Sequence, residues 1–418
     1  MNNKMNKKEW IIDSLLDVDF YKFTMGQLVF LKYPDVPVKY AFKNRTKRVK
    51  LVEIINENEL RVELNHVREL RFNNSELHYL RGTNEYGERM FAESYLDFLK
   101  DLQLPEYHLE YDDDTIRLEF VGKWSESIYW ETIALAIINE LYYRSLINQL
   151  SNFEYDMVFA TGKINLAQKI QALRQQDLQI AFADFGTRRR FSRGWQYYVV
   201  KVLAEELPNH LFGTSNTKIA MDYGLLPIGT AAHEMDMVMS GIMHNSNEEI
   251  RASHNQVLQE WWSLYGWGLS VALTDTYGTD FFLQDMTASQ ARDWKGLRQD
   301  SGDPFEFGEK VIKFYKNKGI DPKKKIVIFS DGLDVAIIIK LATHFRDRLK
   351  VSFGWGTNLT NDLGFSPLSL VIKTVEANGY GLVKLSDNIA KAIGKPEDIE
   401  YFKNIFGYAV ALNQECKY

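Results

Sequence analysis

Two polar turns in residues 213–234 (GTSNTKIAMDYGLLPIGTAAHE) hold side chains that can bind anions or take part in chemistry. Each turn follows an apolar run and then opens a helix, with Thr, Ser or Asn placed to cap it. Turns after successive strands gather on one face of a sheet or barrel, where ligands bind. His233 lies in the second turn. It is either a structural histidine, the usual case, or a general base or phosphoryl acceptor.

Arginines and acids form two further clusters. Arg188 belongs to an arginine triplet, residues 188–190, directly after Asp-Phe-Gly-Thr, and arginine forks bind phosphate and carboxylate bidentately. The triplet opposes the dipole of a helix that starts there, which favours an anion site over a solvated cluster. Arg298 and Asp300 lie in the turn RQDSGDP, where the arginine suits an anion and the acids suit Mg²⁺ or ribose hydroxyls. Asp303 and Pro304 also read as an N-cap and first helical residue.

Two more turns end in small residues, which let backbone N–H groups approach a phosphate. The first is Ser-Asp-Gly with Asp331 and Gly332, and the second is Gly-Trp-Gly-Thr with Gly354, Gly356 and Thr357. Barrel enzymes often bind phosphate after their last two strands, although turns need glycine anyway. Three acids near Tyr277, at positions 275, 280 and 285, either bind a metal or cap and solvate their loop, and we favour the second reading.

The elements that position these turns alternate between strand and helix from about residue 178. Seven apolar runs each end in a polar turn, at residues 180–189, 210–216, 226–234, 269–279, 294–303, 326–332 and 351–357. Helical segments separate them, which calls for parallel strands. Seven such units predict an α/β fold with an irregular, TIM-like barrel, whose active site lies at the C-terminal ends of the strands.

The rest of the chain predicts a smaller α+β domain at residues 1–125, followed by the barrel domain at 126–418 with a helical C-terminal extension. A long helix at 127–148 is apolar on most sides and should be buried. In the tail from about residue 366 we expect a helix, a short strand at 381–385 and a capped helix at 396–406.

Composition narrows the possible functions. The 418 residues include 50 basic and 56 acidic side chains, a net charge of -6, which argues against a broad nucleic-acid surface but allows a local phosphate pocket. Cys416 is the only cysteine, so we expect no disulfide within the chain and no cysteine-based zinc site. We find no secretory signal and no membrane span, and expect a cytoplasmic protein.

The sequence resembles the nicotinate phosphoribosyltransferases, a family of type II phosphoribosyltransferases. The resemblance covers nearly the whole chain. It rests on motifs in this order: DVDFYKFTM, KWSESIYWETIALAIINELYY, FADFGTRRRFS, GTSNT, GTAAHE, LTDTYGT, RQDSGDP, FSDGLD, FGWGTNLTND and GKPEDIEYFKNIFG. Some members carry a C-terminal zinc-binding cysteine cluster, which this chain lacks.

The resemblance implies transfer of the phosphoribosyl group of 5-phosphoribosyl-1-pyrophosphate to nicotinate, giving nicotinate mononucleotide and pyrophosphate. Mg²⁺ and ATP are the implied cofactors, and ATP hydrolysis is coupled through a phosphohistidine at the place of His233. We assign no residue as a metal ligand. Positioning and charge stabilisation should dominate this chemistry, with Arg188, Arg298 and Asp300 as the main groups.

The resemblance also implies a homodimer with shared sites. Phe185 would stack on the pyridine ring, and Tyr21 of a partner subunit on its other face. Ser215 would donate to the nicotinate carboxylate, where a related nicotinamide enzyme has an aspartate, unless it only caps a helix. The alternatives are a nicotinamide or quinolinate phosphoribosyltransferase, or a non-catalytic nucleotide-binding relative. Retention of the clustered charges argues against the last.

Overall fold

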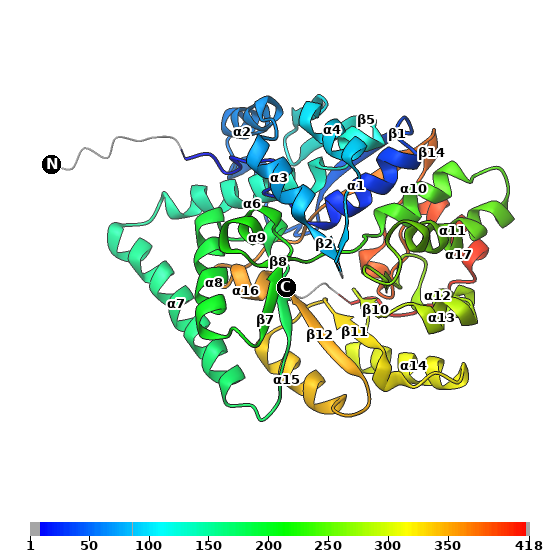
Figure 1. The fold of residues 1–418 in the computed structure, drawn as a ribbon. Helices are drawn as coiled ribbons and strands as arrows, with labels where there is room; N and C mark the ends of the chain where they lie inside the picture. The colour runs from blue at the N-terminus through cyan, green and yellow to red at the C-terminus, as the bar shows by residue number, and fades with distance from the viewer. Residues whose placement is uncertain (1–8, 86, 415–418) are drawn as a thin grey trace.

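A seven-stranded parallel sheet forms the larger part of the molecule (Figure 1). The computed structural model describes residues 9–85 and 87–414. The strand order is β8-β7-β6-β12-β11-β10-β9, so β6 and β12 pair and the sheet curls into an open half-barrel with edges at β8 and β9. Between these edges the Thr230 hydroxyl donates to the Val271 carbonyl at 3.2 Å. The strands are β6 (Phe182–Asp184), β7 (Leu211–Thr214), β8 (Leu226–Pro227), β9 (Val271–Leu273), β10 (Gly296–Gln299), β11 (Ile326–Phe329) and β12 (Lys350–Trp355).

Helices connect these strands, as the alternation of apolar runs and helical segments predicts. They are α8 (Arg193–Glu206), α9 (Thr217–Tyr223), α10 (Glu234–Ile242), α11 (Asn247–Tyr265), α12 (Thr279–Asp285), α13 (Ala288–Asp293), α14 (Pro304–Asn317), α15 (Val335–His344) and the short α16 (Thr357–Thr360). Asp303 caps α14 with Pro304 at its first turn. The predicted α/β fold with seven irregular barrel units is confirmed.

A second sheet is antiparallel, in the order β14-β13-β1-β5-β4. It contains β1 (Pro37–Asn44), β4 (Tyr107–Tyr111), β5 (Ile116–Lys123), β13 (Leu370–Ala377) and β14 (Tyr380–Gly381). The helix expected after residue 366 is wrong, because Leu370–Ala377 is rich in β-branched residues and pairs with β1. The tail therefore completes the sheet of the N-terminal region, while the domain boundary at residue 125 stays a prediction.

The remaining helices lie over this second sheet and on both sides of the barrel (Figure 1). They are α1 (Tyr21–Lys32), α2 (Glu57–Glu69), α3 (Asn74–Gly82), α4 (Glu93–Asp101), α5 (Trp124–Ser127), α6 (Trp130–Ile147), α7 (Asn152–Arg174) and α17 (Pro396–Phe406). The middle helix α6 is buried over most of its length, as its apolar sequence predicts. Helices α2 and α7 were not predicted. Among the described residues, no helix is both long and apolar enough to cross a membrane.

Candidate active site

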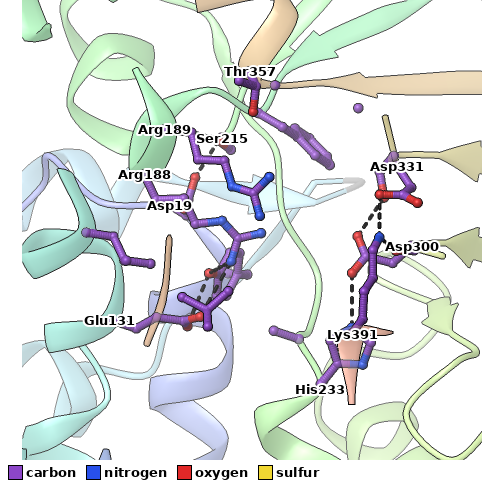
Figure 2. Close-up of a pocket in the computed structure, with 18 of the residues that line it drawn as sticks. Asp19, Glu131, Arg188, Arg189, Ser215, His233, Asp300, Asp331, Thr357 and Lys391 are labelled. Carbon is purple, nitrogen blue, oxygen red and sulfur yellow. Dashed lines mark hydrogen bonds and ion pairs between the residues drawn. The ribbon is translucent and has the colours of Figure 1, made fainter. Parts of the chain in front are cut away.

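A pocket lies at the C-terminal ends of the parallel strands, between the half-barrel and the antiparallel sheet. All twelve residues proposed from the sequence line it: Tyr21, Phe185, Arg188, Ser215, His233, Arg298, Asp300, Asp331, Gly332, Gly354, Gly356 and Thr357. Figure 2 shows two groups of pocket residues. Arg188, Asp19, Ser215 and Glu131 lie on one side, and His233, Asp300, Asp331 and Lys391 on the other.

The arginine triplet after β6 divides between two tasks. Arg188 and Arg189 line the pocket. Arg190 is fully buried and makes a bidentate ion pair with Asp17 at 2.7 and 2.8 Å, so it joins the N-terminal segment to the barrel. The interpretation of the triplet as an anion site therefore fits two of its three members.

Arg188 contacts two groups of its own chain that precede the barrel. Its guanidinium is 3.3 Å from the Tyr21 hydroxyl and 3.5 Å from Glu131. Glu131 is buried and also pairs with Lys373 at 2.5 Å and Lys22 at 2.7 Å. Burial alone would raise the pKa of Glu131, but these cations lower it well below its ordinary value. Glu131 is therefore ionised and holds the cations at this end of the pocket.

Tyr21 lines the pocket of its own chain, and the stacking of a partner subunit's Tyr21 on the pyridine ring stays a prediction. Its hydroxyl is 3.3 Å from Glu131, and its backbone packs on the turn before His233. A Cβ at Gly229 would lie 2.7 Å from the Tyr21 nitrogen, so only glycine permits this approach. The start of α1 is thus built into the same site as the barrel turns.

Ser215 is already engaged by a neighbour. Its hydroxyl donates to Asp19 Oδ1 at 2.6 Å, and its carbonyl accepts from the backbone N–H of Phe20 at 2.7 Å. The N-cap of α9 is Asn216, so the capping alternative for Ser215 is wrong. Burial raises the pKa of Asp19. Asp19 was not predicted as a site residue. Its carboxylate accepts the hydrogen bond that the Ser215 hydroxyl was expected to donate to the nicotinate carboxylate.

The glycines after β12 make room for Phe185. A Cβ at Gly354 would lie 2.3 Å from the Phe185 ring, and one at Gly356 would lie 3.1 Å from the Phe185 carbonyl. One side of the Phe185 ring therefore packs on Gly354. Because the ring covers Gly354, a phosphate group would contact Gly356 and Thr357 instead. Gly332 has a φ of 58°, a conformation that favours glycine.

His233 is buried at the start of α10 and held at both ring nitrogens. Nδ1 is 3.0 Å from the Thr276 hydroxyl, which itself donates to Asp236 at 2.6 Å. The Thr276 oxygen therefore accepts from Nδ1–H, and Nε2 carries the lone pair. Burial, followed by the charge of Lys384, lowers the pKa of His233 to about 4, so the ring is neutral at pH 7.

Nε2 of His233 lies 3.0 Å from Asp300 Oδ2 and 3.8 Å from Asp275 Oδ1. A lone pair facing a carboxylate is stable only with a proton or cation shared between the two groups. One oxygen of Asp275 is buried and makes no hydrogen bond within the described chain. The ligand atoms of these three residues lie within 4.8 Å of one another. Carboxylate oxygens suit Mg²⁺, so Asp275 and Asp300 fit such a cation.

Four cations from outside the barrel turns complete the pocket and were missed by the sequence argument: Arg45, Lys373, Lys384 and Lys391. Lys391 pairs with Asp331 at 2.5 Å and donates to the Asp300 carbonyl at 2.9 Å. No local motif marks these residues, because they reach the site only through the return of the tail to β1. Seven arginines and lysines line the pocket against four carboxylates.

The half-barrel and this cationic pocket define an α/β-barrel enzyme that acts on anionic ligands. Residues 180–409 match the nicotinate phosphoribosyltransferase (NAPRTase) family and residues 16–139 match the NAPRTase N-terminal domain. The chain belongs to the nicotinate phosphoribosyltransferase family.

Solved structures agree with the family match. The chain is similar to nicotinate phosphoribosyltransferase from Porphyromonas gingivalis, with 31% identity, a TM-score of 0.84, and 95% of this chain and 100% of that one covered. It is similar to the Vibrio cholerae enzyme of the same name, with 32% identity, a TM-score of 0.85, and coverage of 98% and 96%. A putative nicotinate phosphoribosyltransferase from Saccharomyces cerevisiae shares 29% identity, with a TM-score of 0.84 and coverage of 96% and 100%.

Proposed function

We propose that this chain transfers the phosphoribosyl group of 5-phosphoribosyl-1-pyrophosphate to nicotinate and couples the reaction to ATP. The observation that carries the proposal is the charge of one pocket, where seven cations face four carboxylates between an aromatic end and a histidine end. Pyrophosphate, a 5-phosphate and nicotinate are all anions, so an excess of fixed cations matches them. Family membership supports the same substrates.

The proposed reaction breaks the bond between C1 of the ribose and the pyrophosphate oxygen, and the electron pair leaves with pyrophosphate. The pyridine nitrogen donates its lone pair to C1, so no proton needs to move. Phe185 and Tyr21 would hold the ring, with Arg188 and Lys373 near its carboxylate. Arg298 would stabilise the leaving group, and its Nη2 donates to the Ala231 carbonyl at 3.1 Å, beside the His233 turn.

The other end of the pocket would hold the sugar phosphate. Asp300 and Asp331 can accept from ribose hydroxyls, and the backbone after Gly356 and around Gly332 can donate to the 5-phosphate. Asp275 and Asp300 would hold Mg²⁺. When bound, this ion neutralises charge on the pyrophosphate group.

Within this proposal, Nε2 of His233 attacks the γ-phosphorus of ATP and forms an N–P bond, while the bond from that phosphorus to the β,γ-bridging oxygen breaks and ADP leaves with its electron pair. The neutral ring has its lone pair on Nε2 because Nδ1 keeps its proton and donates it in a hydrogen bond to the Thr276 hydroxyl oxygen. A phosphoryl group on Nε2 would add negative charge beside Arg298 and Lys384 and change the affinity for the sugar substrate. We also propose a homodimer, as the family resemblance implies, and a cytoplasmic location, which the single cysteine favours.

Incubation with γ-labelled ATP tests the phosphohistidine. The wild type should take up label that mild acid removes, because histidine N–P bonds are acid-labile. His233→Ala should take up none, whereas His108→Ala, on an exposed strand far from the pocket, should label normally. Equal labelling of His233→Ala and wild type would refute the assignment.

Product formation separates the alternative substrates. The purified protein should form nicotinate mononucleotide from nicotinate, 5-phosphoribosyl-1-pyrophosphate and Mg²⁺, faster with ATP than without. Preference for nicotinamide or quinolinate would favour a different transferase. Ligand binding without turnover on any of the three acceptors would favour a non-catalytic relative.

A further inference from the structure

Lys22 lies between two buried carboxylates that belong to different ends of the pocket. Its Nζ is 2.7 Å from Glu131 and 2.6 Å from Glu234, and the three side chains are at most 3% exposed. Burial alone would lower the pKa of Lys22, but the two carboxylates raise it above its ordinary value. One carboxylate would neutralise a buried ammonium, so the second joins two parts of the structure. Figure 2 shows Glu131 on one side of the pocket and His233 on the other.

Glu131 is the acceptor end of this bridge. Its Oε1 accepts a hydrogen bond from Lys373 at 2.5 Å and lies 3.5 Å from Arg188, and both cations line the pocket. These cations are the groups proposed to lie near the nicotinate carboxylate. A carboxylate bound between them would compete with Glu131 for the same N–H donors. Because a buried carboxylate needs a cation, Glu131 would then depend more strongly on Lys22.

Glu234 is the histidine end of the bridge. It directly follows His233 and begins α10. Besides Lys22 on α1, its carboxylate accepts hydrogen bonds from the Tyr40 hydroxyl on β1 at 2.5 Å and from Nε1 of Trp124 on α5 at 2.7 Å. These three donors fix the first turn of α10, so a movement of Lys22 would reach the backbone of His233.

Two further contacts join α1 to the turn before His233. The Thr24 hydroxyl donates to the Thr230 carbonyl at 2.6 Å, and the Ala232 N–H donates to the Met25 sulfur at 3.1 Å. Helix α1 therefore lies directly against this turn, and the position of the histidine depends on the position of α1.

We propose that Lys22 is a positioning residue that makes acceptor binding and phosphorylation of His233 depend on each other. This inference rests on the proposed function. An acceptor carboxylate draws Lys22 toward Glu131 and away from Glu234. The first turn of α10 is then held less firmly, and the histidine is phosphorylated more slowly. Because coupling between two sites is reciprocal at equilibrium, the phosphorylated form should bind nicotinate more weakly.

Label uptake from γ-labelled ATP, with and without saturating nicotinate, tests the bridge. The sugar substrate is left out, so no transfer occurs and only nicotinate binding acts on the histidine. In the wild type, nicotinate should slow labelling about fivefold or more, the low end of typical couplings between sites. Glu234→Gln keeps the size of the side chain but turns an amide toward Lys22. Nicotinate should therefore change its labelling rate less than about twofold.

Two more variants complete the series. Lys22→Met removes the bridge itself and should also lose the response to nicotinate, with far-UV circular dichroism as the check of its fold. Glu140→Gln alters another buried carboxylate of α6, which pairs with Arg144 at 2.9 Å. It is the matched control and should respond to nicotinate as the wild type does.

The ratio of the two labelling rates distinguishes coupling from damage to the fold. A merely structural role of the bridge would slow labelling equally with and without nicotinate and leave the ratio in Glu234→Gln at the wild-type value. Equilibrium dialysis should show that Glu234→Gln binds nicotinate within about twofold of the wild type, because Arg188 and Lys373 are unchanged.

A wild-type ratio retained in Glu234→Gln would overturn the proposal. So would a wild type whose labelling is unchanged or accelerated by nicotinate, and either result would leave the proposed phosphohistidine intact. A wild type that takes up no label would instead refute the proposed phosphorylation, and the coupling with it.

Discussion

His233 and Thr276 form a hydrogen-bonded pair beside the pocket. Thr276 stands between Nδ1 of His233 and the carboxylate of Asp236, at 3.0 and 2.6 Å, and fixes which ring nitrogen has the proton. Burial raises the pKa of Asp236. A histidine that accepts a phosphoryl group at Nε2 needs its lone pair there, so Thr276 is a positioning residue for the proposed phosphorylation.

We expect Thr276→Val, which keeps the shape and removes the acceptor, to slow labelling of His233 by ATP about 10- to 100-fold, the value of one hydrogen bond. Transfer without ATP should change little, because it does not use the histidine. Thr274→Val, two residues earlier at another buried threonine, is the control for packing. Labelling at the wild-type rate in Thr276→Val would exclude the positioning role.

Individual site residues could be predicted from the sequence where a residue type is unusual for the turn that holds it. Arg298 and Asp300 stand out because charge at the end of a buried strand is costly without a ligand, and His233 stands out as a histidine in a polar turn. All three lie in one pocket. Asp19 and Lys391 could not be found in this way. Each is an ordinary residue in a loop whose place is set by long-range pairing, such as the bridge between Asp19 and Asn216.

Among the elements, the N-terminal segment and the turns after β6 and β7 are joined by buried charge. Asp17 accepts two hydrogen bonds from Arg190 and one from Asn216 at 2.6 Å, and Asp17 and Arg190 are at most 1% exposed. Burial raises the pKa of Asp17, but Arg190 and these hydrogen bonds lower it by more, to below its ordinary value.

Arg190→Met should lower the free energy of unfolding by about 3–5 kcal/mol, because it leaves Asp17 buried without its partner. Urea denaturation at pH 7 measures this change. Arg174→Met removes an ion pair that is about half exposed, with Glu206, and should cost at most about 1 kcal/mol. A loss of at most about 1 kcal/mol for Arg190→Met as well would contradict the claim that the buried pair with Asp17 stabilises the fold.

The pH dependence of the free energy of unfolding tests the same pair, Asp17 and Arg190. A lowered folded pKa means that Asp17 stabilises the wild type above its unfolded pKa, and this stability is lost as pH falls below about 4. In Arg190→Met the buried carboxyl loses its cation, so its pKa should rise and protonation should favour the folded state. The stability gap between the two proteins should therefore narrow as the pH falls from 7 to 4. A constant gap over this range would contradict the account.

Helices and strands were predicted correctly where a sequence pattern repeats. The prediction failed for a strand whose pairing partner is distant in the chain. Seven strand–turn–helix units were visible because apolar runs and polar turns alternate at regular spacing. The strand β13 was not visible in this way, since its partner β1 is more than 300 residues away in the chain. Its place matters for the site, because β13 carries Lys373 and the loop after it carries Lys384 and Lys391.

Across the whole molecule, segments that are far apart in the sequence contribute side chains to one pocket. Tyr21 on α1, Arg188 after β6 and Arg298 on β10 line a single pocket, and the hydroxyl of Tyr21 touches the guanidinium of Arg188 in the same chain.

Mixing inactive Tyr21→Ala chains with inactive Arg298→Ala chains separates independent sites from shared ones. If each chain supplies its own Tyr21, every site in a mixed dimer carries one defect, and nicotinate mononucleotide formation should stay at the level of the single variants. If Tyr21 came from the partner, one site in each mixed dimer would be intact. Random exchange would then restore about a quarter of wild-type activity. Native mass spectrometry of the mixture verifies that subunits have exchanged. Recovery near that quarter would refute the placement of Tyr21 in its own pocket.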